Sequence, residues 1–247
     1  MTAAETLSAV AFAGYGIVVV AGLAFTYYAV QNYAFDRLEG YDDFWGYLTY
    51  LGLAFAAFGA LGLVLTVRDA SVVRAFADVS LLVAIAFLTF ALREVYFNSA
   101  LAPSPDERAV SLDRVRRLEF GFVAVIAAEW LVVMLIDQPA VAAGVKAAGA
   151  VGFAAYGVAF SERLETLAHG TVLDTLRRHL LLVLVCATGV AVADALALVA
   201  PAAVADALAL VAPAAVADGV FYVFLVLLGG LLVPPTVRLQ QSVAGLT

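Results

Sequence analysis

The chain of 247 residues is 65% hydrophobic and only 13% charged, its formal net charge is −7, and its mean hydropathy is +1.03. Soluble domains are roughly half apolar and about a quarter charged, so this composition predicts a polytopic membrane protein. It excludes a nucleic-acid-binding protein, a secreted disulfide scaffold and a soluble enzyme with a small anchor. Residues 1–247 leave no room for a second domain, and we expect a single transmembrane domain in the cell membrane.

Seven apolar windows follow one another along the chain. A bilayer core of about 30 Å requires about 20 apolar residues in a helix, because irregular backbone cannot face lipid. The windows that meet this length are 8–31, 46–67, 75–97, 118–136, 140–160, 179–200 and 216–237. They predict an all-α fold, a bundle of seven transmembrane helices.

Basic residues predict how the bundle is oriented, because Arg and Lys in short loops accumulate on the cytoplasmic side. With the N-terminus outside, the outer side carries Arg68, Arg74 and Lys146, and the inner side carries ten arginines. The count predicts an outer N-terminus and a cytoplasmic C-terminus.

Acidic residues exceed basic ones by 20 to 13, and Lys146 is the sole lysine. This balance resembles the composition of halophile proteins, whose acidic surfaces keep them soluble in high salt. Cys186 is the only cysteine, which excludes an intrachain disulfide and a thiolate metal cluster.

Capping signals predict short helix extensions on the cytoplasmic side. Ser104 followed by Pro105 and Glu107 is typical of a helix N-terminus, so we expect the fourth helix to begin before the membrane. Gly170 is suited to end the fifth helix, and Thr171 to begin the sixth. We name these predicted extensions the cytoplasmic collar.

The collar carries charges of both signs. The pairs Asp113–Arg117 and Asp174–Arg178 have the i,i+4 spacing of helix-stabilising ion pairs. Arginines on the approach to the fourth span predict a docking surface for a protein partner. The docking candidates are Arg108, Arg114, Arg116 and Arg117.

A perfect repeat precedes the last span: AVADALALVAPA at 191–202 recurs at 203–214. The second copy is too short to span the membrane and is bounded by Pro201 and Pro213. One interpretation is an interfacial or re-entrant helical piece that covers the outer mouth. The other is a neutral insertion tolerated in a surface loop.

Ionisable residues fall inside several predicted spans, where such side chains are costly and mark pathways or pairs. Those near the ends of the third span are expected to be interfacial, with long side chains that reach the membrane surface. They are Asp78, Arg93 and Glu94. Glu129, Lys146 and Asp194 are deeper, each about 10 Å below the outer surface.

Glu129 and Lys146 lie symmetrically about the short connection at 137–139. Because so short a connection makes spans four and five antiparallel neighbours, we predict that the two side chains form a buried ion pair.

Motifs for cofactors and metals are missing from the sequence. It has no glycine-rich phosphate loop, no HExxH and no Cys-x-x-Cys, and His169 and His179 both fall in the collar. We therefore predict no metal site, no catalytic residues and no cofactor.

Seven spans with an outer N-terminus resemble the topology of the microbial rhodopsins, and Arg74 with Asp78 resembles the counter-ion region of that family. The last span, VFYVFLVLLGGLLV, has no lysine to bind retinal. The resemblance therefore covers topology only and implies no retinal site.

Two functions remain open. The first is a transporter or pathway for ions, protons or small solutes, built on Glu129, Lys146, Asp194 and Asp78. The alternative is a non-enzymatic signalling or assembly subunit that docks a partner through the collar. A membrane enzyme ranks third, because few polar residues lie at the interface. The expected partners are the lipid bilayer and a protein; a homo-oligomer is left open, and nucleic acid is excluded.

Overall fold

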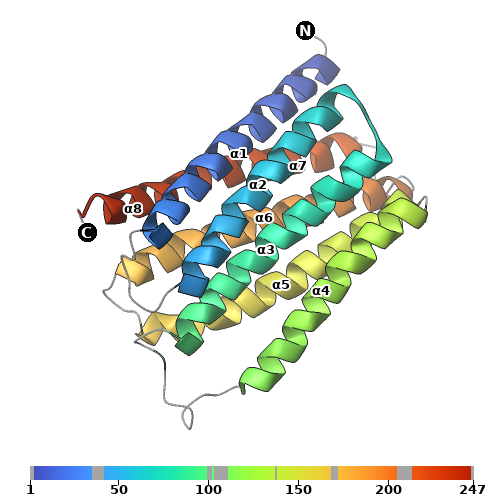
Figure 1. Ribbon diagram of the computed structural model, residues 1–247. Helices are drawn as coiled ribbons and strands as arrows, with labels where there is room; N and C mark the ends of the chain where they lie inside the picture. Colours follow the sequence, from blue (N-terminus) through green and yellow to red (C-terminus); the bar gives the residue numbers. More distant parts are fainter. Residues whose placement is uncertain are drawn as a thin grey trace.

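The computed structural model describes residues 3–34, 42–98, 102, 111–136, 138–167, 172–204 and 213–245. Seven of its helices are long and apolar enough to cross a membrane, which confirms the predicted all-α, seven-helix membrane fold. The helices of the described residues are α1 (Ala3–Ala34), α2 (Asp42–Val67), α3 (Ser71–Asn98), α4 (Leu112–Leu135), α5 (Pro139–Leu167), α6 (Val172–Val204), α7 (Pro213–Leu231) and α8 (Val233–Val243) (Figure 1).

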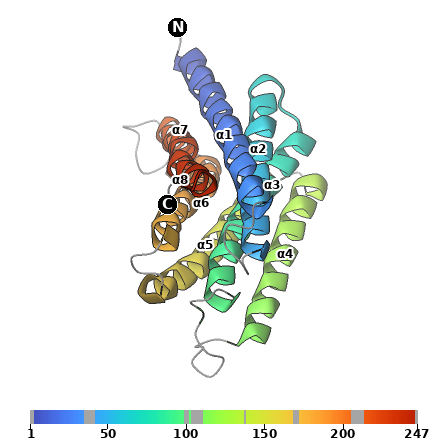
Figure 2. The same cartoon turned by 60° about the vertical axis from the view of Figure 1, so that its left-hand side comes forward.

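Helix α3 occupies the centre of the bundle, where it contacts α2, α4, α5 and α6. Helix α1 closes the other side by packing on α2, α7 and α8. Helix α4 lies at the edge and, among the described helices, touches only α3 and α5 (Figure 2). We call the end of the bundle that holds the first turn of α1 the N end, and the opposite end, which holds α8, the C end.

Helices α1 and α2 approach each other closely through glycines. A Cβ atom added to Gly22 would lie 2.8 Å from the main-chain nitrogen of Ala56, and one on Gly59 would lie 2.9 Å from the carbonyl oxygen of Tyr15. Side chains larger than hydrogen would force the two backbones apart. Small residues thus provide the van der Waals contact that holds helices together in lipid.

The last transmembrane helix ends where a pair of prolines predicts a break. Helix α7 stops at Leu231, and α8 begins at Val233 with proline in its first turn. Proline lacks an N–H group and cannot continue the hydrogen-bond ladder of the preceding helix. The side chain of Asn32 in α1 donates a hydrogen bond to the carbonyl oxygen of Leu239 at 3.0 Å, which ties α8 to the bundle.

Helices α4, α5 and α6 extend beyond the predicted spans at the C end. Helix α4 begins at Leu112 with Ser111 as its N-cap residue, and not at the capping signal of Ser104 and Pro105. Asp174 pairs with Arg178 at 2.9 Å, as predicted. Arg117 instead donates to the main-chain carbonyl of Asp113 at 3.3 Å, so the predicted ion pair of these two side chains is wrong. The capping residues 104–107 and 170–171, together with Arg108 and His169, lie outside the described residues.

The repeated segment is only partly described. Helix α6 continues past Pro201 to Val204, and α7 begins at Pro213. Residues 205–212 of the second copy lie outside the described residues, so both interpretations of the repeat remain predictions.

Candidate functional site

Three helices bring opposite charges together near the N end of the bundle. Lys146 of α5 donates a hydrogen bond from Nζ to Oδ1 of Asp78 in α3 at 2.6 Å, and a second one to Asp194 in α6. We name the N-end cluster after these three residues together with Glu129 of α4. Asp78 and Asp194 are 68 and 48 positions away from Lys146 in sequence, so only the packing of the helices brings them into contact with it.

Burial differs within the N-end cluster. The side chains of Lys146, Asp78 and Asp194 are 4%, 12% and 30% exposed. An ammonium group so enclosed requires carboxylates as partners, because burying an unpaired charge is costly. Asp194 is the member that opens most toward solvent.

A pocket of about 380 Å³ opens at the N end, directly above the N-end cluster. Asp78 and Asp194 contribute to its lining, and its mouth carries an exposed ion pair between Arg74 and Asp69 at 2.8 Å. The opposite wall is apolar except for Gln138. The lining residues from the connection between α4 and α5 and from the two helices themselves are Val133, Ile136, Gln138, Pro139, Ala142 and Ala143.

Glu129 occupies an unusual position in the cluster. Its side chain is fully buried at 0% exposure, and neither carboxyl oxygen has a hydrogen-bond partner within the described residues. It lies in electrostatic range of Asp78, Lys146 and Asp194. Glu129 is therefore a buried acid whose charge no direct contact compensates.

The predicted ion pair between Glu129 and Lys146 is wrong. Helices α4 and α5 are neighbours, as expected, but the ammonium group of Lys146 reaches α3 and α6 instead of α4. Equal depth in the membrane does not fix the direction in which a side chain leaves its helix. The pairing is decided by the rotation of each helix about its axis.

Asp78 is also placed differently from the expectation. Sequence position suggested an interfacial residue, whereas the residue is only 8% exposed and bonded to Lys146. The structure thus brings together the four residues of the predicted pathway, with Asp78 rather than Glu129 as the direct partner of the lysine.

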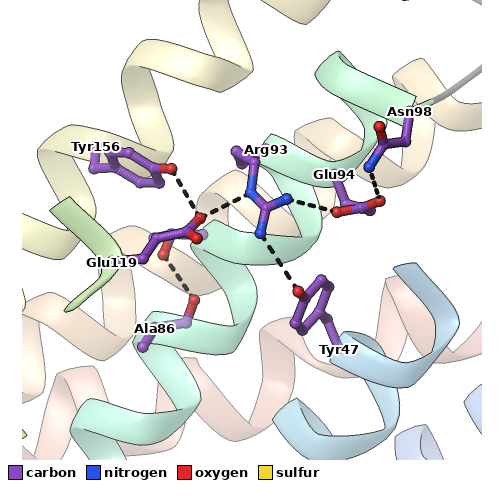
Figure 3. A network of polar contacts seen from close by, with 8 residues as sticks. Tyr47, Ala86, Arg93, Glu94, Asn98, Glu119 and Tyr156 are labelled. Atoms are coloured by element: carbon purple, nitrogen blue, oxygen red, sulfur yellow. Dashed lines mark hydrogen bonds and ion pairs between the residues drawn. The ribbon is translucent and has the colours of Figure 1, made fainter. Parts of the chain in front are cut away.

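A second buried network lies toward the C end of α3. Arg93 donates from Nε to Glu119 at 2.8 Å, from Nη1 to Glu94 at 2.7 Å and from Nη2 to the hydroxyl of Tyr47 at 3.4 Å (Figure 3). We call these residues, with Asn98 and Tyr156, the C-end network. Arg93 and Glu94 are 8% and 5% exposed, so the expected extension of both side chains to the membrane surface is wrong.

The acids of the C-end network are held from several sides. Glu119 of α4 also accepts a hydrogen bond from the hydroxyl of Tyr156 at 3.2 Å, and Glu94 accepts one from Asn98. Sequence reasoning missed Glu119, which lies at the start of the fourth predicted span. The signal for it was Arg93, a cation inside a span that requires an acidic partner.

An apolar layer separates the two charged groups. Asp78 and Arg93 are 15 residues apart on α3, or about 22 Å along a helix. Leu82 and Ile85 between them are fully buried, and the rings of Phe122 and Phe153 pack with centroids 4.1 Å apart. These apolar side chains therefore lie between the N-end cluster and the C-end network.

The predicted docking arginines are partly described. Arg114, Arg116 and Arg117 are exposed on the first turns of α4, while Arg108 lies outside the described residues. Arg177 is buried instead, where it bonds to Asp174 at 2.8 Å and to the carbonyl oxygen of Ser161 at 2.9 Å. The three arginines of α4 are therefore accessible to a partner, whereas Arg177 is not.

Within the described residues, no group of three or more His, Cys, Asp or Glu side chains is arranged to hold a metal ion. No protein-family model, curated protein or solved structure matches the chain. The function must therefore be argued from the site itself.

Proposed function

We propose that the chain is a small multi-pass transporter or ion pathway that takes up small cations through the pocket at its N end. The observation that carries this proposal is the position of the N-end cluster. It is an ionic group enclosed among helices, yet two of its carboxylates line a solvent-open pocket. Ionisable residues at membrane depth that border a cavity are characteristic of pathways for ions and protons.

The balance of charge supports a cationic substrate. Four acids belong to the pocket and cluster, against two bases. The acids are Asp69, Asp78, Glu129 and Asp194, and the bases are Arg74 and Lys146. An enclosed site lined by an excess of one sign raises the local concentration of the opposite charge. An incoming cation would compete with the ammonium of Lys146 for the same carboxylates.

The apolar layer supports a gated pathway rather than an open pore. Passage toward the C end would require Leu82, Ile85 and the pair Phe122–Phe153 to move apart. Apolar constrictions of this kind block ions when they exclude water. We further propose that the pocket faces outward across the cell membrane, as the distribution of arginines favours.

Reconstitution of the full chain into liposomes tests this proposal. The probes are protons, followed with an entrapped pH-sensitive dye, and Na⁺, K⁺ and methylammonium, followed as uptake. Flux above that of empty liposomes is expected for at least one probe, and flux of none would overturn the proposal.

A substitution at the pocket wall sharpens the same assay. Asp194→Asn should lower uptake by about tenfold or more, because a contact with a charged group contributes roughly 1.5–3 kcal/mol. Asp43→Asn, an exposed carboxyl at the C end, is the matched control and should leave uptake unchanged. Equal uptake by both variants would place the pathway elsewhere.

Partner docking is a second candidate, favoured by the exposed arginines of α4. Reversal of Arg114, Arg116 and Arg117 to glutamate should release a protein partner that co-purifies from native membranes. Reversal of Arg68, exposed at the N end, serves as the control. Unchanged co-purification with a correctly inserted triple variant would remove this candidate.

A further inference from the structure

We propose that Glu129 is a proton-binding site of the chain, and that its proton is exchanged for the cation that enters the pocket. This inference rests on the proposed function and adds the coupling ion to it. It starts from the one member of the N-end cluster that makes no hydrogen bond within the described residues.

The surroundings of Glu129 favour a neutral carboxyl. The side chain is fully buried, and neither oxygen receives a hydrogen bond from the described residues. A bare carboxylate in such a place loses its hydration without replacement, whereas a protonated carboxyl loses much less. Taking up a proton removes the unmatched charge.

The charged groups within electrostatic range of Glu129 act in opposite directions, and the negative ones outnumber the positive one. Facing Glu129 are Asp78 from α3, Lys146 from α5 and Asp194 from α6. The ammonium of Lys146 already donates to both aspartates. Two carboxylates against one ammonium leave the surroundings of Glu129 negative by one charge, which disfavours a further negative charge.

Glu129 lies one helical turn away from a residue of the pocket wall. Val133 lies four residues after Glu129 in α4, so the two share one face of the helix, and Ile136 is the C-cap residue at the end of that helix. Val133 and Ile136 line the pocket. The main chain of Glu129 therefore lies about 6 Å along the helix axis, one helical turn, from that of Val133 in the pocket wall.

Exchange follows from the balance of charge. A cation that binds at Asp78 and Asp194 cancels the excess negative charge beside Glu129. The O–H bond of Glu129 then breaks, the proton passes to water in the pocket, and the carboxylate remains. One cation replaces one proton, so the charge of the site is unchanged, and the reverse step returns the proton when the cation leaves.

Infrared difference spectroscopy of the full chain in liposomes tests the proton site directly. At neutral pH the wild type should show the C=O band of a protonated carboxyl, and Glu129→Gln should lack it. Glu129→Asp, which keeps the acid, should retain a shifted band. Glu94→Gln is the matched control, because Glu94 is a buried carboxyl that accepts from Arg93 and Asn98. A band that persists in Glu129→Gln would overturn the proposal.

The wild type alone supplies a second readout that needs no folded variant. Addition of the probe cation that the liposomes take up should abolish the band and release protons into weakly buffered medium. Cation uptake with an unchanged band would refute the exchange.

Failure of the two proposals can be told apart. A Glu129 band in liposomes that transport none of the probe cations would preserve the proton site and refute the transport proposal. Cation uptake with no protonated carboxyl at neutral pH would preserve transport and refute the proton site.

Discussion

The N-end cluster and the C-end network lie on the same central helix and use similar side chains, but they are built differently. In each, a buried cation meets two carboxylates: Lys146 meets Asp78 and Asp194 on two other helices, and Arg93 meets Glu94 of its own helix and Glu119 of α4. Both therefore hold helices together by charge.

The difference lies in how completely the acids are satisfied. In the C-end network each carboxylate accepts from Arg93 and from a second donor, Asn98 or Tyr156. In the N-end cluster Glu129 lacks a partner among the described residues, and Asp194 borders a pocket. A fully bonded network resists change, whereas an incompletely matched one can exchange a proton or an ion. The C-end network therefore has the features of a structural element, and the N-end cluster those of the proposed ion pathway.

The largest effect is expected at the cation of the N-end cluster. Lys146→Met leaves the carboxylates of Asp78 and Asp194 without their ammonium partner and should lower the free energy of unfolding by about 3–5 kcal/mol. Chemical unfolding in mixed micelles would measure it. Adding Asp78→Asn and Asp194→Asn to the same chain should recover much of the loss. A stable single variant would show that the cluster is not charged as described.

A smaller loss is expected from Arg93→Lys in the C-end network. Lysine keeps the charge but cannot place three donors in the planar arrangement that reaches Glu94, Glu119 and Tyr47. The free energy of unfolding should fall by about 1–3 kcal/mol, while cation uptake per folded molecule stays unchanged. Loss of uptake in a stably folded protein would move this network into the pathway.

Tyr156→Phe separates one hydrogen bond from the rest of the C-end network. It removes the donor to Glu119, whose other partner Arg93 remains. We expect a loss of about 0.5–1.5 kcal/mol in the free energy of unfolding and no change in uptake. An effect as large as that of Arg93→Lys would show that Tyr156, and not the arginine, holds Glu119.

The smallest effect on stability belongs to the exposed pair at the mouth of the pocket. Asp69→Asn should change the free energy of unfolding by less than about 1 kcal/mol, because exposed ion pairs contribute little. Cation uptake should slow at low ionic strength, and the difference from wild type should vanish at high salt, where surface charges are screened. A salt-independent defect would indicate direct binding by Asp69 instead.

Hydropathy alone determined the number of transmembrane helices, because each lipid-spanning segment must bury its backbone in a helix of fixed minimum length. The break between α7 and α8 at Pro234 and Pro235 and the extended ends of α5 and α6 were likewise predictable, since they follow from local backbone chemistry. The common level of Lys146 and Asp194 along the bundle could also be read from the chain, because helix rise per residue is constant.

Only the tertiary structure decided which charges meet. Helices surrounded by lipid are apolar on nearly all sides, so no polar face reveals how each is rotated or which neighbour it touches. Glu129 and Lys146 share a depth, yet the lysine turns toward Asp78 and Asp194. Arg93 near a helix end could have reached the membrane surface, but Glu119 and Tyr47 on adjacent helices hold it inside the bundle. Helix packing decides which of these residues from different helices become partners. The spacing of residues along one helix contains no information about that packing.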